Sequence, residues 1–118
     1  MVELRTELNP LRLVLGKSKK VELMIQITND SDKARLMSCD ILLSNQMAFE
    51  KQGRTNAQSL MLGNVSPGER IIRYLQIFPR MSIEEGEQPV FVTVMEHYED
   101  KYDYILSKKT KKISLRVE

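Results

Sequence analysis

The side chains best suited to chemistry gather in one segment, "EHYEDKYDY", at residues 96–104. Its four carboxylates offer oxygen ligands of the kind that calcium prefers, and they are Glu96, Glu99, Asp100 and Asp103. Calcium takes about six to eight oxygens, and its usual loop alternates acidic residues around a glycine. The segment has neither that alternation nor a glycine. A solvated hairpin tip is therefore the favoured interpretation, and calcium binding is the alternative.

The same segment carries three tyrosines, Tyr98, Tyr102 and Tyr104. Tyrosine supplies a large, stiff contact area with a polar end, and exposed loops rich in it often bind partners. Packing of these rings against the end of the fold is the alternative. His97 is the only histidine, and no serine, cysteine or glycine-rich motif accompanies it in the segment. We expect a surface histidine rather than a general acid or base.

Cys39 is in phase with Met37 and Ile41 in "RLMSCDILL", which predicts a buried, unreactive core residue. A single cysteine excludes an intramolecular disulfide and fits a reducing compartment. Neither Cys39 nor any other pattern predicts a metal site, a cofactor or a catalytic group. We therefore expect a protein that is not an enzyme.

Lysines form the basic run "KKTKK" at 108–112, and "GKSKK" at 16–20 has a similar composition. Such runs can contact nucleic-acid phosphates, but no aromatic residues are interleaved with them. Lysines near strand ends also prevent edge-to-edge aggregation, which is the favoured interpretation. The net charge of +2, from 18 basic and 16 acidic residues, does not favour nucleic acid or a membrane surface as partner.

No apolar run approaches the roughly 18 residues of a membrane span, and the first residues lack a continuous apolar signal core. These features predict a cytoplasmic protein without a membrane partner. If the chain is a piece of an exported protein, the expected location is extracellular.

The dominant pattern along the chain is alternation of apolar and polar residues, which is typical of half-buried β-strands. In "KVELMIQIT" (20–28), Val21, Leu23, Ile25 and Ile27 share one face. Seven or eight such segments, separated by turn residues, predict an all-β, immunoglobulin-like β-sandwich of two antiparallel sheets. A length of 118 residues predicts a single domain, 1–118. The segments are 2–15 (bent or split at Pro10), 20–28, 35–43, 47–49, 59–62, 70–78, 89–96 and 110–117.

Several strands have apolar residues on the outward face as well. These residues are Met24, Ile72, Tyr74, Phe78, Phe91 and Met95. An apolar outer face would suit a subunit or domain interface, and methionine adapts to varied partners. The alternative is that the phase of some strands is misassigned and these residues belong to the core.

The order of turns and strands resembles the CARDB-type group of immunoglobulin-like domains over roughly residues 9–117. The resemblance rests on Pro10, on the strand Val21 to Ile27 followed by Asn29, and on the turn "LGNVSPGE" with Leu62, Val65, Pro67, Gly68 and Glu69. It implies a non-catalytic module used as a spacer, an adhesion unit or a protein-binding platform.

These observations predict a non-catalytic protein-interaction or structural module without cofactors. We expect it to bind a protein partner or a second copy of itself, through Tyr98, Tyr102 and Tyr104 or through the outward residues Met24, Ile72, Tyr74, Phe91 and Met95. The alternative is a module that binds carbohydrate or calcium with the loop 96–104.

Overall fold

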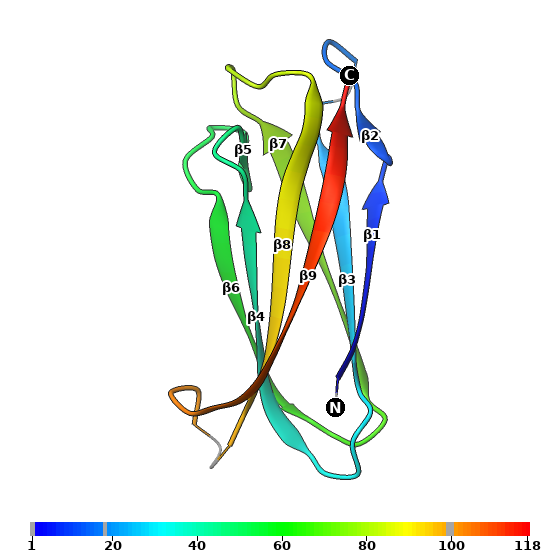
Figure 1. Ribbon diagram of the computed structural model, residues 1–118, viewed down its shortest axis with the longest axis vertical. Helices are drawn as coiled ribbons and strands as arrows, with labels where there is room; N and C mark the ends of the chain where they lie inside the picture. Colours follow the sequence, from blue (N-terminus) through cyan, green and yellow to red (C-terminus); the bar gives the residue numbers. More distant parts are fainter. Residues whose placement is uncertain (1, 18, 99–100) are drawn as a thin grey trace.

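The computed structural model describes residues 2–17, 19–98 and 101–118, which form nine β-strands in two layers (Figure 1). The all-β sandwich is confirmed. The described strands exceed the expected seven or eight because Pro10 separates two strands that join different sheets. The strands are β1 (Val2–Asn9), β2 (Arg12–Leu13), β3 (Val21–Asn29), β4 (Arg35–Leu43), β5 (Met47–Ala48), β6 (Ala57–Val65), β7 (Arg70–Pro79), β8 (Gly86–His97) and β9 (Ile105–Val117).

The first sheet has the strand order β1-β3-β7-β5, and the second has the order β2-β9-β8-β4-β6. All of these pairs are antiparallel except β2 with β9, which is parallel. The chain crosses from the first sheet to the second between Asn9 and Arg12. As a result β1 lies at the edge of one layer and β9 lies beside it in the other (Figure 1).

The core lies between the two sheets and follows the predicted alternation. On β3, every second residue from Val21 to Ile27 is buried, while Glu22, Met24 and Gln26 are half-buried on the outer face. Cys39 and Ile41 of β4 are buried opposite them, as predicted. Burial of such branched and sulfur-containing side chains is the main favourable term in folding, at about 25 cal/mol per Å² of apolar surface.

Asn29 joins two turns at one end of the sandwich. Its backbone N–H donates to the Glu69 carbonyl at 3.0 Å, and its carbonyl accepts from the Gly68 N–H at 2.7 Å. Gly68 has a φ of 76°, which glycine adopts without strain in the turn after Pro67. The Asn29 side-chain amide donates to the carbonyls of Lys33 and Val65, both at 2.8 Å. The asparagine and the Pro-Gly turn recognised in the sequence are thus one connected structure.

β9 is longer than the sequence pattern predicted. It begins at Ile105 rather than at residue 110, and it pairs with β8 over nearly its whole length. Residues 105–112 are exposed on both faces, so they lack the apolar–polar alternation by which the other strands are recognised. Their strand conformation comes from long-range pairing with β8, which no local pattern records.

The molecule is elongated, with principal extents of 47 × 23 × 18 Å. The hairpin between β8 and β9 projects at one end of the long axis, and the C-terminal end of β9 lies at the other (Figure 1). None of the residues that the structure describes form a helix of the length and apolarity needed to cross a membrane.

Candidate functional site

The candidate site is the hairpin that connects β8 to β9. The Tyr98 N–H donates to the Tyr104 carbonyl at 3.2 Å, and the Lys101 N–H donates to the Tyr98 carbonyl at 3.3 Å. The register shifts between Glu96 and His97, where one extra residue in β9 bends the ladder. This bend turns the hairpin away from the axis of the strands (Figure 1).

Two of the three predicted tyrosines stack on one another at this hairpin. The ring centroids of Tyr98 and Tyr104 lie 5.2 Å apart with an interplanar angle of 23°. The Lys101 ammonium lies 5.6 Å from the centroid of the Tyr104 ring, within the range of a cation–π contact. Tyr98 is 40 % exposed and Tyr104 is 39 % exposed. Stacking therefore restrains both rings while leaving part of each exposed.

Tyr102 instead fastens the hairpin to the second sheet. Its ring meets the His97 ring edge-on, with centroids 5.2 Å apart and an interplanar angle of 72°. Its hydroxyl oxygen accepts a hydrogen bond from the Gly63 N–H of β6 at 3.0 Å. The three tyrosines thus have two roles, because Tyr98 and Tyr104 present a surface and Tyr102 holds it in place.

His97 is buried beneath this hairpin, so the expectation of a surface histidine is wrong. His97 Nε2 lies 2.7 Å from Ser38 Oγ, and His97 Nδ1 lies 3.1 Å from the Tyr104 carbonyl oxygen. A carbonyl only accepts hydrogen bonds, so Nδ1 carries the proton in that contact, and Nε2 accepts from Ser38 in the neutral ring. The burial arises because the hairpin folds back over the outer face of the sheet, a long-range contact absent from the local sequence.

The serine–histidine pair has the contact distance of a nucleophile and its base, yet it is enclosed. Ser38 is 2 % exposed and His97 is 4 % exposed. A catalytic pair of this kind needs an open position for the substrate beside the serine oxygen. In this structure the hairpin occupies that side of the sheet, and the pair connects the hairpin to β4.

The carboxylates of the segment do not converge. Glu96 is buried and accepts a hydrogen bond from the Ser107 hydroxyl, whereas Asp103 is exposed. Glu99 and Asp100, the other two predicted calcium ligands, lie outside the described residues. Among the residues that are described, no group of three or more histidine, cysteine or acidic side chains is placed to hold a metal ion.

Burial suppresses the chemistry of the Cys39 thiol. Loss of hydration, with the charge of Asp40 as the smaller cause, raises the pKa of Cys39 to about 12. The thiolate is the reactive form of cysteine, so this thiol stays protonated and unreactive at neutral pH. The sequence-based interpretation of Cys39 as a core residue is confirmed.

The predicted outward apolar residues lie on opposite sides of the sandwich. Met24 is opposite Tyr74 in the ladder between β3 and β7, and with Ile72 they line a shallow, mostly polar hollow on the outer face of the first sheet. Phe91 and Met95 lie on the outer face of the second sheet instead. Strands of different sheets direct their outward side chains in opposite directions, so these residues do not form one surface.

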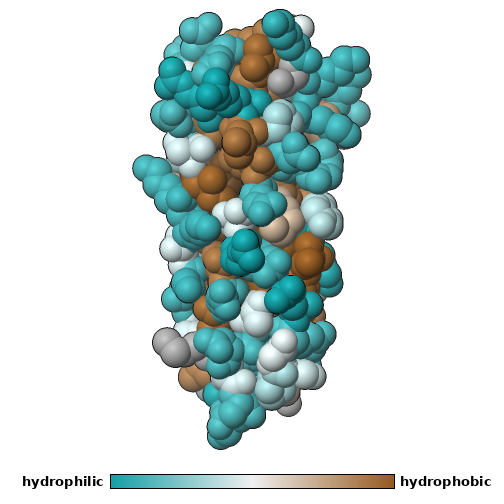
Figure 2. All heavy atoms as spheres, turned by 90° about the vertical axis from the view of Figure 1, so that its right-hand side faces the viewer, coloured by the Kyte–Doolittle hydropathy of each residue, from teal (hydrophilic) through white to brown (hydrophobic). Residues whose placement is uncertain are grey.

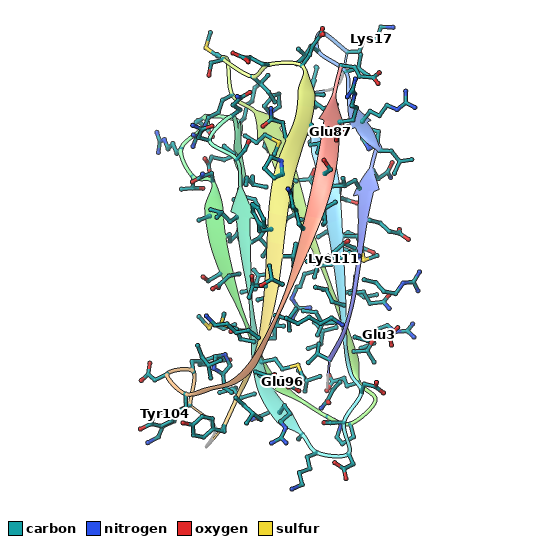
Figure 3. All side chains as sticks on the ribbon, viewed as in Figure 1. Glu3, Lys17, Glu87, Glu96, Tyr104 and Lys111 are labelled. Atoms are coloured by element: carbon teal, nitrogen blue, oxygen red, sulfur yellow. The ribbon has the colours of Figure 1, made fainter. Side chains whose placement is uncertain are left out.

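Met95 needs a correction, because it is buried rather than exposed. It lies opposite Ser38 in the ladder between β4 and β8, on the outer face of the sheet that it shares with His97. Conversely, sequence reasoning missed two exposed apolar residues, Ile105 and Leu106, which directly follow Tyr104. The signal for them in the sequence is an apolar pair directly after three tyrosines, in the segment between the strands expected at 89–96 and 110–117. We call Tyr98, Tyr104, Ile105 and Leu106 the hairpin surface; Figure 3 labels Tyr104 at this end of the molecule.

No protein-family model matches the chain, and no protein of curated function matches it in sequence. Solved structures nevertheless share its fold. A FixG-related protein from Vibrio parahaemolyticus has a TM-score of 0.62 at 7 % identity, and the match covers 99 % of this chain and 96 % of that one. The major pilin subunit of Bacillus cereus has a TM-score of 0.69 at 10 % identity, over 99 % of this chain and 40 % of the pilin.

The major subunit of Myf fimbriae from Yersinia enterocolitica has a TM-score of 0.56 at 13 % identity, over 100 % of this chain and 98 % of that one. Identities this low establish a shared architecture and leave the activity of each protein to its own surface residues. The chain therefore has an immunoglobulin-like β-sandwich fold, similar to FixG-related, pilin and fimbrial subunit domains.

Proposed function

We propose that the chain is a non-catalytic immunoglobulin-like module that binds another protein through the hairpin surface. The observation that carries the proposal is an exposed apolar and aromatic surface held in a fixed conformation. Stacking of Tyr98 on Tyr104 and the anchor of Tyr102 on Gly63 restrain the surface before any partner arrives. A surface that is already ordered loses less conformational entropy on binding, which favours affinity.

The composition of this surface suits a protein partner. Tyrosine and large aliphatic residues are enriched at the centres of protein interfaces, where they bury apolar area and keep a polar group at the edge. Lys101, beside the Tyr104 ring, adds one cation at the border of the surface. A small-molecule site would more typically be a concave pocket with a few converging polar groups.

The burial of Ser38 and His97 supports a structural role for this pair. A substrate would reach Ser38 only after the hairpin left the sheet, which would break the contacts of Tyr102 and Tyr104. The pair therefore contributes to holding the hairpin surface in place. The enclosure of Ser38 and His97 favours binding over catalysis as the function of this end of the molecule.

We also propose membership of the CARDB-type group. The support is that the two motifs of the resemblance meet in space, because Asn29 hydrogen-bonds to both Gly68 and Glu69. A family-wide pattern at these positions in related sequences is the observation that would test membership.

Site-specific photo-crosslinking in the source cells tests the binding proposal. A photoreactive phenylalanine analogue replaces Tyr98 in one protein and Tyr74, an exposed tyrosine of the first sheet, in the control. We expect a discrete crosslinked protein from position 98 that is absent from position 74 and is lost when Tyr104→Ser is added. Equal crosslinking at both positions would contradict the proposal.

Two further outcomes separate the alternatives. A crosslinked species of twice the chain's mass would identify a second copy as the partner. A rise in melting temperature with calcium or simple sugars, without crosslinking at position 98, would favour the ligand-binding module. Circular dichroism of each variant checks that the fold is retained.

A further inference from the structure

Most of the outer edge of β9 has no neighbouring strand among the described residues. β8 pairs with β9 from Ile105 to Val117, but β2 pairs with it only at Arg116 and Val117. β2 therefore covers only one end of this edge of β9, and the rest of the edge has no strand beside it among the described residues. Unpaired strand edges present backbone donors and acceptors to which another extended chain can add.

The direction of these backbone groups follows from the contacts of Glu118. Its N–H donates to the Leu13 carbonyl at 2.8 Å, and its carbonyl accepts from the Leu15 N–H at 2.7 Å, so both groups point toward β2. Backbone groups alternate sides along a strand, so every second residue points the same way. Residues on this open side, beyond the short reach of β2, are Lys108, Thr110, Lys112 and Ser114.

A seam with two hollows runs beside this open edge, between β9 and β1. One hollow, of about 340 Å³, is lined by Val2, Val94 and Lys109 among others. The other, of about 460 Å³, is lined by Leu8 and Ile113 among others. Figure 2 views this side of the molecule and shows apolar atoms running along it between hydrophilic side chains. An added strand would therefore meet apolar contacts as well as backbone hydrogen bonds.

Four lysines line the open edge and project to both faces of β9. Lys109 and Lys111 lie opposite Val94 and Val92, which face the core, so these two lysines are on the seam side. Lys108 and Lys112 are on the outer face. Among the described residues, none of the four forms an ion pair, and Lys109 Nζ donates to the Val2 carbonyl at 3.3 Å. Figure 3 labels Lys111 on this strand.

Carboxylates near the seam are few and do not neutralise these lysines. Glu96 borders the first hollow but accepts a hydrogen bond from Ser107. Glu7 borders the second hollow and is exposed. Glu3 is exposed on the outward-facing side of β1. The open edge of β9 is therefore a basic strip.

We infer that the open edge of β9 is a binding site for an extended acidic segment of another protein, which adds as a strand beside residues 108–114. The lysines determine the occupant, because a second copy pairing through the same edge would bring like charges directly opposite one another. An acidic strand would pair its carboxylates with the lysines on one face of β9 while its backbone hydrogen-bonds to the open edge. This site is separate from the hairpin surface and does not depend on it.

The first test uses a fluorescent peptide of about eight residues that alternates glutamate and valine, which matches the length of the open edge at about 3.4 Å per residue. We expect binding by fluorescence anisotropy at low salt. The same peptide with lysine in place of glutamate, or with alternate backbone nitrogens methylated, is expected to bind at least about tenfold more weakly. Equal binding of the methylated peptide would overturn strand addition.

Amide hydrogen exchange reads out the geometry directly. In the free protein we expect slow exchange at Lys109, Lys111 and Ile113, whose N–H groups face β8, and fast exchange at Thr110 and Lys112. Saturating peptide should slow the fast amides at least about tenfold, because they become ladder donors. Unchanged exchange at Thr110 and Lys112 with peptide bound would place the peptide elsewhere and overturn the inference.

Charge variants test the choice of an acidic partner. Combining Lys109→Glu with Lys111→Glu should weaken peptide binding at least about tenfold, whereas Lys19→Glu with Lys20→Glu makes the same charge change in a turn and should not. Thr110→Pro removes one open-side N–H without changing charge and should also weaken binding. A single-stranded oligonucleotide of equal charge that bound as tightly as the peptide would identify a phosphate site and overturn the inference.

Discussion

Replacing Asn29 by alanine should destabilise the fold more than any other exchange of an asparagine in the chain. Asn29 is fully buried, and its side-chain amide donates to the Lys33 and Val65 carbonyls, both at 2.8 Å. Its Oδ1 accepts from the Ser31 N–H at 3.0 Å and from the Ser31 hydroxyl at 2.7 Å. Alanine removes all four contacts at the junction of two turns.

The size of the stability loss depends on which of the former hydrogen-bond partners of Asn29 can hydrogen-bond to water in the variant. A typical intramolecular hydrogen bond contributes about 1 kcal/mol, and a buried group left without a partner costs about 1–3 kcal/mol. Ser31 and Lys33 lie near the surface and regain water, whereas the contact to Val65 is buried. We therefore expect a loss of about 2–4 kcal/mol. At about 2.1 cal/mol/K per residue, a chain of 118 residues would melt roughly 8–16 °C lower.

Urea unfolding followed by circular dichroism measures this loss, with midpoints compared at a common slope. Asn64→Ala is the matched control, because Asn64 is exposed on β6 and should change stability by less than about 0.5 kcal/mol. Asn29→Asp keeps an acceptor for Ser31 but places a carboxylate oxygen against two carbonyls, so it should cost at least as much as alanine. An Asn29→Asp variant as stable as the unmodified chain would refute the assignment of the Asn29 amide as donor to Lys33 and Val65. Equal urea midpoints for Asn29→Ala and Asn64→Ala would refute the stabilising role of all four Asn29 side-chain contacts.

Three further predictions concern individual side chains. Burial raises the pKa of Cys39 from 9.0 to about 12. An aromatic disulfide reagent should therefore not react with Cys39 in the folded protein near pH 8, and should release one equivalent of its own aromatic thiolate after unfolding. The stability that the protonated thiol contributes is complete below about pH 9 and is lost as the pH rises toward 12. Ser114→Ala should raise the pKa of Glu87 in an NMR titration, because the Ser114 hydroxyl is the main group that lowers it. Tyr102→Phe should speed hydrogen exchange of the Gly63 amide several-fold while lowering stability by less than about 1.5 kcal/mol, and unchanged exchange would argue against that hydrogen bond.

The parts of the fold predicted from sequence are those in which burial alternates along one strand. On β3 the four apolar residues from Val21 to Ile27 are all buried, because a period of two places them on the face toward the core. Cys39 and Ile41 were assigned by the same rule. In the segment expected at 59–62, the alternating residues Leu60 and Leu62 both pack against the core.

The parts that could not be predicted depend on contacts between distant segments. Nothing in residues 105–112 marks them as a strand, since both faces are exposed and only the pairing with β8 fixes their conformation. His97 and Met95 look like surface residues locally, and the hairpin residues Tyr102 and Tyr104 that contact His97 come later in the chain. The outward orientation of Met24 and Phe91 is predicted correctly from the alternation. The alternation does not show that their strands belong to different sheets, because sheet membership depends on which strands pair with one another.

The lysine edge of β9 makes the association behaviour of the protein depend on counterions. The Debye length falls from about 10 Å at 0.1 M salt to about 3 Å at 1 M, so concentrated electrolyte screens the repulsion that keeps two such edges apart. Capture of an acidic strand should weaken under the same conditions. Added salt should therefore promote pairing between two copies of this edge and weaken its binding of an acidic strand. Buffers of low ionic strength should keep the chain monomeric at this edge and able to bind the acidic strand.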